Sequence, residues 1–185
     1  PTEDILRNLL SRGVFLTAAH VVDKLGKELT VRFPDGTEVA AVTTAIDTEL
    51  DVAILEPKDA RDGGALPWAP LAAEAPAVGT RVVVIGHPGQ WTPDGEATGY
   101  QPWTVSTGKI RAFDGDPLDD QRMGGVEHDA WTYWGHSGSP LFDERGRIVA
   151  LHNSWDSSNA MRHAVRYEAI RHLLDDAGVG YHLAE

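Results

Sequence analysis

The sequence contains no cysteine among its 185 residues. This absence excludes disulfides, zinc ribbons, iron–sulfur clusters and thiol nucleophiles together. Long apolar runs are also missing, since the longest covers only residues 82–85 and is too short for a transmembrane helix. The start of the sequence lacks the basic and apolar regions of a signal peptide. The cellular location therefore stays open, with a cytoplasmic one favoured by the lack of cysteine and of a signal peptide.

Positive charge is scarce as well. The sequence has 16 Lys and Arg against 28 Asp and Glu, which gives a formal net charge of −12. An acidic protein repels phosphate groups, so neither nucleic acid nor an anionic membrane is expected as the main partner. Hydrophobic residues make up 42% and charged residues 24%, the proportions of an ordinary globular protein. An initiator methionine is absent, so we interpret the sequence as a processed chain or a piece of a longer protein.

What the sequence does contain is a succession of short β-type segments bounded by Gly, Pro and Asp. The clearest is a hairpin, in which residues 29–33 and 37–46 alternate on either side of the turn Pro34-Asp35-Gly36. Further strands are expected at residues 52–55, 80–86, 104–113, 126–133, 141–142 and 148–152. Many short strands separated by turns predict an all-β protein built from barrels or sandwiches.

Helical patterns are few. Residues 18–25 fit a single turn, and residues 167–177 show the i, i+3/i+4 spacing of an amphipathic helix that ends before Gly178. The segments without a period are interpreted as one linker and two exposed loops, at 57–79, 87–102 and 114–125. The linker divides the chain into two β-rich halves, which we assign to residues 1–75 and 76–185.

Three motifs supply the side chains of a hydrolytic site: Leu16-Thr-Ala-Ala-His20, Asp51-Val-Ala-Ile-Leu55 and Gly135-His-Ser-Gly-Ser-Pro140. A serine hydroxyl is a weak nucleophile, so it needs an imidazole to take its proton and a carboxylate to orient that imidazole. His20, Asp51 and Ser137 are the residues of these kinds in the motifs. Gly135 and Gly138 let the backbone turn sharply, so the amides of Gly135 and Ser137 are expected to point at one oxyanion.

These motifs, in this order, resemble the signatures of the trypsin/chymotrypsin-like serine peptidases, bacterial members above all and the glutamyl endopeptidases in particular. The segment from Gly135 to His152 follows their pattern almost throughout, and the resemblance covers residues 13–177. It implies two six-stranded antiparallel β-barrels followed by a C-terminal helix, with the catalytic groups in the cleft between the barrels. It also implies a serine endopeptidase that acts on protein or peptide substrates, forms one peptidase unit from both halves, and requires no metal and no organic cofactor.

Two alternatives to a free-standing active peptidase remain. One is a catalytically inactive trypsin-like fold that serves as a protein-binding module, because each of the three residues alone also fits a structural role. The other is a regulated effector peptidase domain of a larger bacterial defence or signalling protein. The missing initiator methionine, the lack of a signal peptide and the lack of cysteine motivate this second alternative.

The resemblance also implies residues for substrate choice. In glutamyl endopeptidases, a Thr five positions before the serine and a His on the following strand bind the carboxylate of an acidic P1 side chain. Thr132 and His152 stand at these positions, so cleavage after acidic residues is expected. The alternative is that both are ordinary strand residues without a role in substrate choice. Trp131 falls near the pocket base, where an Asp would select Lys or Arg, so a basic preference is not expected.

No metal site is expected from the other histidines. They are spread along the chain without an H-x-x-x-H pattern or a cysteine partner. The loop at residues 114–125 holds Asp114, Asp116, Asp119 and Asp120. We interpret it as a solvated acidic loop, with a cation site as the alternative.

Overall fold

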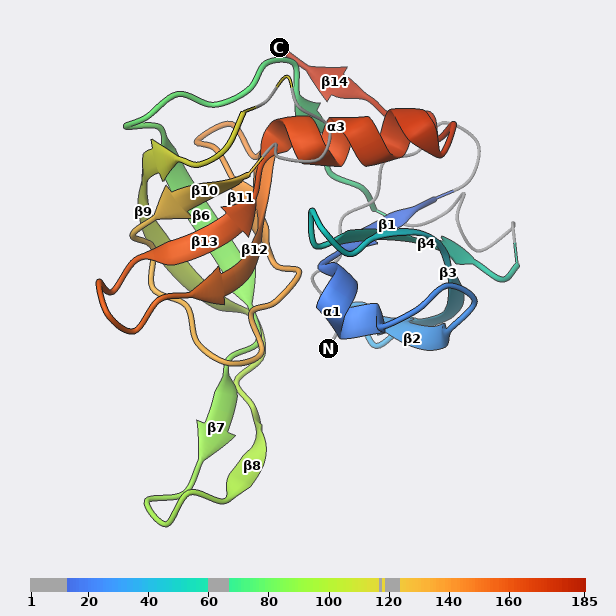
Figure 1. The fold of residues 1–185 in the computed structure, drawn as a ribbon. Coiled ribbons are helices and arrows are strands. Elements are labelled where there is room, and N and C mark those ends of the chain that lie inside the picture. The colour runs from blue at the N-terminus through green and yellow to red at the C-terminus, as the bar shows by residue number, and fades with distance from the viewer. Residues whose placement is uncertain (1–12, 60–66, 117, 119–123) are drawn as a thin grey trace.

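The computed structural model describes residues 13–59, 67–116, 118 and 124–185 of the chain. Most of its strands form two bodies, an N-terminal sheet and a C-terminal barrel, with a helix lying across both (Figure 1). The predicted all-β class with a C-terminal helix is confirmed.

The N-terminal sheet is antiparallel and has the strand order β1-β4-β3-β2. Its elements are β1 (Phe15–Thr17), helix α1 (Ala19–Val22), β2 (Glu28–Arg32), β3 (Glu38–Asp47) and β4 (Val52–Pro57). The predicted hairpin is confirmed, because β2 pairs with β3 and the N–H of Phe33 donates to the carbonyl of Thr37 across the turn. Within residues 13–59 the strands form a half-barrel and not a closed six-stranded one.

The second body is a closed six-stranded barrel. Strand β11 pairs with both β6 and β12, which closes the order β11-β6-β9-β10-β13-β12 into a ring. The strands are β6 (Arg81–Gly86), β9 (Thr104–Phe113), β10 (Gly125–His128), β11 (Pro140–Phe142), β12 (Ile148–Trp155) and β13 (Arg162–Val165). Val82 and Val84 of β6 are buried while Arg81 is exposed, so the period-two pattern turns the apolar face of this strand inward.

Two segment predictions from the sequence are corrected here, and one strand was missed. Residues 87–102 are not an irregular loop, because β7 (Gly89–Trp91) and β8 (Ala97–Tyr100) pair as a hairpin that projects from the barrel (Figure 1). The strand expected at 126–133 ends at His128, since the Asp129 carboxylate accepts the N–H of Lys109 at 2.7 Å and replaces the next ladder bond. Strand β13 was not expected at all, and its pairing with β10 and β12 creates it.

The expected linker also contains a strand. Within residues 67–79, β5 (Leu71–Ala72) pairs in parallel with Ile148 of β12 and with β14 (Leu183–Ala184) near the end of the chain. The hydroxyl of Tyr167 donates to the carbonyl of Ala72 at 2.6 Å. Partners far away in the sequence therefore hold this connection in place, which explains why its own residues show no strand pattern.

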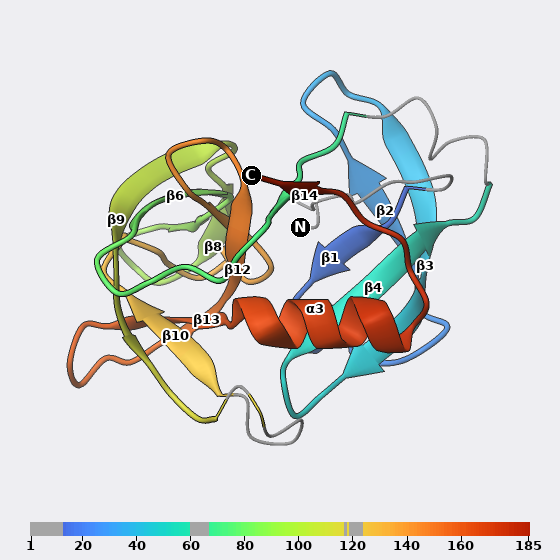
Figure 2. The same cartoon turned by 90° about the horizontal axis from the view of Figure 1, so that it is seen from above.

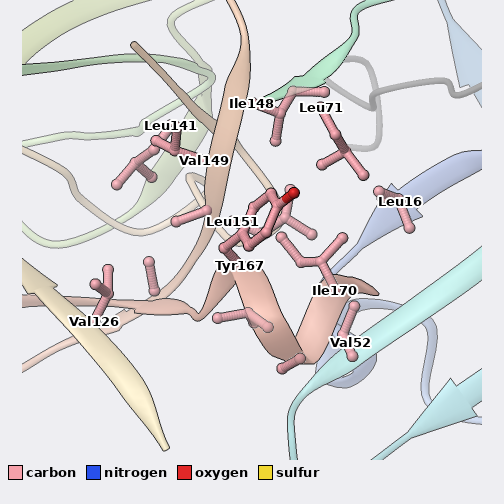
Figure 3. Packing of buried hydrophobic residues seen from close by; sticks show 14 of the residues in the cluster. Leu16, Val52, Leu71, Val126, Leu141, Ile148, Val149, Leu151, Tyr167 and Ile170 are labelled. Atoms are coloured by element: carbon pink, nitrogen blue, oxygen red, sulfur yellow. The ribbon is translucent and has the colours of Figure 1, made fainter. Parts of the chain in front are cut away.

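The largest apolar cluster crosses the boundary between the two bodies (Figure 3). Leu16 and Val52 enter it from the N-terminal sheet, Leu141 and Leu151 from the barrel, and Ile170 from the C-terminal helix. All five side chains are completely buried. Burial of each is worth about 1.5–3 kcal/mol, so this shared core holds the sheet and the barrel in a defined relative position.

Strands β1 and β4 serve two cores at once. Leu16 and Ile54 point into the shared cluster, while Phe15 and Leu55 point into a second cluster inside the N-terminal sheet. Successive residues of a strand face opposite sides, so the sequence of a strand that lies between two cores is a continuous apolar run. This arrangement gives His20 and Asp51, which follow β1 and precede β4, a rigid support.

Helix α3 (Tyr167–Asp176) confirms the amphipathic helix expected near the C-terminus. It lies between the barrel and the N-terminal sheet in the view from above (Figure 2) and buries one face against both. Gly178 follows the helix with a φ of +66°, the left-handed conformation expected of a glycine at this position. No helix in the described part of the chain has both the length and the apolar character needed to cross a membrane.

Candidate active site

His20 and Asp51 form a hydrogen-bonded pair at the edge of the N-terminal sheet. His20 Nδ1 lies 2.9 Å from Asp51 Oδ2 and 3.1 Å from Oδ1. The backbone N–H of His20 also donates to Asp51 Oδ1, at 3.0 Å. A carboxylate only accepts hydrogen bonds, so it selects the imidazole tautomer with the proton on Nδ1 and leaves Nε2 as a proton acceptor.

The turn before β4 aims the Asp51 carboxylate at α1. The Asp47 side chain accepts the backbone N–H groups of Glu49 at 3.0 Å and Leu50 at 2.9 Å, which closes a tight turn. Asp51 itself has a φ of +56°, a left-handed conformation that Asp tolerates better than most residues. The local sequence around Asp51 therefore builds the bend that brings its side chain to His20.

Ser137 comes from the loop before β11 and borders the same cavity as His20. The cavity has a volume of about 340 Å³ and is lined by His20, Tyr133, Trp134, Ser137, His152, Asn153, Ser154, Trp155 and Ser157. Ser137 Oγ donates to the carbonyl of Asn153 at 3.3 Å, its only hydrogen bond to a described residue. Within the described chain, no hydrogen bond joins Ser137 Oγ to His20.

The loop that carries Ser137 depends on two glycines. Gly135 has a φ of +102° and Gly138 a φ of +87°, values that disfavour residues with a Cβ. A Cβ on Gly135 would clash with the carbonyl oxygen of His87, and one on Gly138 would clash with Thr17 Oγ1 of β1. The Gly138 contact sets the loop that carries Ser137 directly against the strand that leads to His20.

The backbone of this loop leaves two amides free. Within the described chain, neither the N–H of Gly135 nor that of Ser137 donates a hydrogen bond. The neighbouring amides are used, since His136 N–H donates to the carbonyl of Tyr133 and Gly138 N–H donates to that of His152. Two free amides beside a serine hydroxyl are the donors that an oxyanion requires.

His152 forms part of the cavity wall and is only 2% exposed. Its Nδ1 lies 3.2 Å from Nε2 of His128, which is wholly buried in the barrel. Burial lowers the pKa of His128 to about 4. Burial, followed by the nearby His128, also lowers the pKa of His152 well below its usual value of 6.5. Both imidazoles are therefore neutral at neutral pH.

The other two residues considered for substrate choice do not border the cavity. Thr132 is 1% exposed, and its hydroxyl has no hydrogen-bond partner among the described residues. Trp131 is 47% exposed and stacks on Tyr133 with ring centroids 6.2 Å apart. The structure thus brings His152 to the cavity with His20 and Ser137, and leaves the buried Thr132 outside its lining.

Several cavity residues were missed in the sequence. Tyr133, Trp134 and Trp155 are more than a third exposed and line the cavity beside Ser137. Aromatic residues flanking the serine motif were the available signal, because exposed aromatic side chains often mark binding surfaces. The role of His128 had no sequence signal, since its contact with His152 arises from barrel closure.

One group of three candidate metal ligands occurs in the described residues, namely Asp114, Glu127 and His163. His163 Nδ1 lies 4.0 Å from Asp114 Oδ2, and the group lies outside the cavity that contains Ser137. Asp119 and Asp120 of the acidic loop fall outside the described residues. The interpretation of this loop as solvated stays a prediction.

The pKa of His20 gives a pH prediction. Its hydrogen bond to Asp51 raises the pKa above 6.5, although burial acts in the opposite direction. A protonated imidazole cannot accept the serine proton, so we expect kcat/KM to fall as the pH drops through a midpoint above 6.5. Asp51→Asn removes the cause of the shift and should move the midpoint to lower pH, with a maximal rate lower by about 10⁴-fold. An unchanged midpoint in Asp51→Asn would contradict the prediction that the Asp51 carboxylate raises the pKa of a His20 that accepts the serine proton.

The fold and the order of the site residues are those of the trypsin-like serine peptidases. The chain belongs to the trypsin-like peptidase domain family, whose profile matches residues 8–151. This confirms the broader resemblance expected from the motifs. The narrower likeness to glutamyl endopeptidases stays a prediction from the sequence.

Individual relatives agree with the family. The chain is 32% identical over 146 residues to the serine protease HhoA of Synechocystis sp. and 30% identical over 142 residues to a periplasmic DegP-like serine endoprotease of Pseudomonas savastanoi. These matches cover 77% and 76% of this chain but only 34% and 26% of the relatives. The chain therefore spans about a third or less of the length of these relatives.

A solved structure shows the same fold. The serine endoprotease from Yersinia pestis superposes with a TM-score of 0.70 over 92% of this chain and 55% of that one, at 22% sequence identity. The closed barrel and half-barrel therefore have the chymotrypsin-like arrangement that the resemblance implied.

Proposed function

We propose that this chain is an active serine endopeptidase with Ser137 as nucleophile, His20 as general base and Asp51 as the residue that orients His20. One observation carries the proposal. His20 is held by Asp51 through Nδ1 at 2.9 Å and borders the same cavity as Ser137, with Nε2 left to accept a proton. Protein or peptide substrates suit such a site, because the family and the named relatives are peptidases.

The reaction follows from these positions. Ser137 Oγ attacks the scissile carbonyl carbon while His20 Nε2 takes the hydroxyl proton, and the oxygen gains negative charge. The amides of Gly135 and Ser137 donate to this oxyanion, and Asp51 stabilises the imidazolium. His20 then gives the proton to the leaving amine, whose departure completes the acyl-enzyme, and a water molecule repeats the sequence to release the acid.

The two chain segments 1–75 and 76–185 would then work as one peptidase unit. The first supplies the base and the carboxylate, and the second supplies the nucleophile and the oxyanion donors. Two features support this: the apolar cluster shared by both bodies, and the close approach of Gly138 to Thr17 beside the site.

One observation favours a resting or non-catalytic state as the second candidate. Ser137 Oγ donates to the carbonyl of Asn153 instead of contacting His20. Such a site suits a protein-binding module without activity, or a regulated peptidase domain of a larger bacterial protein. The greater length of the relatives supports the idea that further domains accompany this one.

We also propose that the site prefers acidic P1 residues, glutamate above aspartate. His152 supports this, because its Nδ1 faces His128 and its other nitrogen is left for the cavity. If His128 donates to Nδ1, His152 carries its proton on Nε2 and donates it to the P1 carboxylate. The net charge of −12 slows the approach of acidic substrates, so the rate should rise with moderate salt.

Profiling with a peptide library tests both proposals. We expect dominant cleavage after Glu, and a fall of about 10- to 100-fold in the Glu-to-neutral ratio in His152→Ala, since a hydrogen bond to a charged group is lost. His182→Ala, an exposed histidine that stacks on Trp68 at 5.0 Å, is the matched control and should keep the ratio. Dominant cleavage after Arg, Lys or large apolar residues would refute the P1 preference alone. No cleavage of any peptide by folded protein would favour the binding module.

A further inference from the structure

The β7–β8 hairpin takes no part in the apolar cores of the protein. Residues 89–100 are all described, and none of them belongs to either apolar cluster. The base of the hairpin is nevertheless fixed. The N–H of Gln101 donates to the carbonyl of Pro88 at 2.8 Å, and His87 packs edge-on against Trp103 with ring centroids 4.5 Å apart. A hairpin that is held at its base but absent from the cores has its main contacts with the loop before β11.

The hairpin holds one peptide unit of that loop. The N–H of Gly89 donates to the carbonyl of Trp134 at 2.5 Å. This carbonyl and the N–H of Gly135 belong to the same planar trans peptide unit, so they point in opposite directions. The hydrogen bond from Gly89 therefore directs the free N–H of Gly135 away from the hairpin. A flipped peptide unit would lose this hydrogen bond and would turn the N–H of Gly135 toward the hairpin.

Tyr100 supports the same peptide unit from the second strand of the hairpin, where it is the register partner of Gly89. A Cβ on Gly135 would come within 2.9 Å of Cε1 and 3.0 Å of Cδ1 of the Tyr100 ring, so the edge of this ring lies against Gly135. Glycine has wide conformational freedom, so its neighbours must fix its backbone. Tyr100 is 52% exposed, so its ring covers the loop and fills no core.

We propose that Gly89 and Tyr100 are positioning residues that hold the Trp134–Gly135 peptide unit, so that the N–H of Gly135 points at the oxyanion. This inference rests on the proposed peptidase function and adds the part of the fold that orients one of its donors. Gly89 supplies a hydrogen bond and Tyr100 supplies a packing surface, and both act through Gly135. A donor that is oriented in advance stabilises the charge of the transition state without reorganisation during the reaction.

Tyr100→Ala tests the packing surface, with kcat and KM measured separately. We expect kcat to fall by about 10- to 100-fold with KM nearly unchanged, because the donor acts in the transition state. Tyr100→Phe keeps the ring edge that lies against Gly135 and should restore the wild-type kcat. Trp68→Ala is the control, since it removes a ring that is 50% exposed and stacks on His182, and it should leave kcat unchanged.

Gly89→Pro tests the hydrogen bond, because proline has no N–H to donate to the carbonyl of Trp134. We expect a fall in kcat of about 10- to 100-fold here as well. The pH midpoint of kcat/KM should stay as in the wild type, because the pair of His20 and Asp51 is untouched. Thr98→Ala changes another exposed residue of β8 and should keep the wild-type kcat.

The results separate this inference from the proposal on which it rests. A folded wild-type protein that hydrolyses no peptide refutes the proposed function and this inference together. An active wild type with an unchanged kcat in both Tyr100→Ala and Gly89→Pro overturns only the positioning role. A higher KM with unchanged kcat would also overturn it, because the hairpin would then contribute to substrate binding alone. A Tyr100→Phe variant as slow as Tyr100→Ala would overturn the role of the ring.

Discussion

Ser137→Ala is expected to lower kcat/KM by about 10⁴- to 10⁶-fold while the fold stays intact. The loss is large because the variant has no atom to form the acyl-enzyme, so His20 and the oxyanion donors have nothing to activate. Stability should change by about 1 kcal/mol or less, since Ser137 makes one hydrogen bond of 3.3 Å and is only half-buried. Peptide hydrolysis and thermal unfolding of the purified variant measure the two quantities.

A fluorophosphonate probe adds a readout of the nucleophile itself. We expect the wild-type protein to be labelled and Ser137→Ala to remain unlabelled. Ser158→Ala changes an exposed serine in the turn after β12 and serves as the matched control, which should be labelled like the wild type. Full hydrolysis by Ser137→Ala would exclude this serine as the nucleophile. A folded wild-type protein that is never labelled would favour the binding module.

Gly135→Ala is expected to lower kcat by about 10²- to 10³-fold, the cost of one lost oxyanion donor. The added Cβ would clash with the carbonyl oxygen of His87 and come within 2.9 Å of Tyr100 in the β7–β8 hairpin. Relief of the clash requires the backbone at Gly135 to move, which turns its N–H away from the oxyanion position. The side chains of His20, Asp51 and Ser137 remain in place, so the effect isolates the contribution of the backbone.

Gly146→Ala is the matched control for this prediction. Gly146 also has a positive φ, +74°, but a Cβ there would meet no atom within 4 Å. The variant should lose about 1 kcal/mol of stability from the strained conformation and keep its turnover. An unchanged kcat in Gly135→Ala would mean that the oxyanion donors lie elsewhere.

Elements stabilised by neighbouring residues were predicted from the sequence, whereas elements that depend on distant residues were missed. The hairpin of β2 and β3 and helix α3 are encoded by neighbouring residues, through a turn at 34–36 and an amphipathic period that ends at Gly178. The hairpin of β7 and β8 was missed because its strands are exposed and have no apolar alternation. Strand β13 was missed because it is created by its pairing partners.

The sequence by itself determined the class of the protein and predicted the chemistry of its candidate site. A histidine, an aspartate and a serine, each within a short motif, appear in the order and context typical of trypsin-like peptidases, and the family match agrees. Such motifs are readable because each depends on its immediate neighbours. Gly135 and Gly138, for example, allow the turns around Ser137 whatever the rest of the chain does.

The tertiary structure alone decided which residues surround the cavity that contains Ser137. His152 borders it while the buried Thr132 does not, although the family resemblance implied both residues there. His128 reaches His152 from β10, through a register that exists only when the barrel closes. Barrel closure depends on many weak contacts between residues that are distant in the sequence. The sequence of a single segment therefore does not indicate it. Burial, which sets the charge state of His128 and His152, is likewise a property of the assembled core.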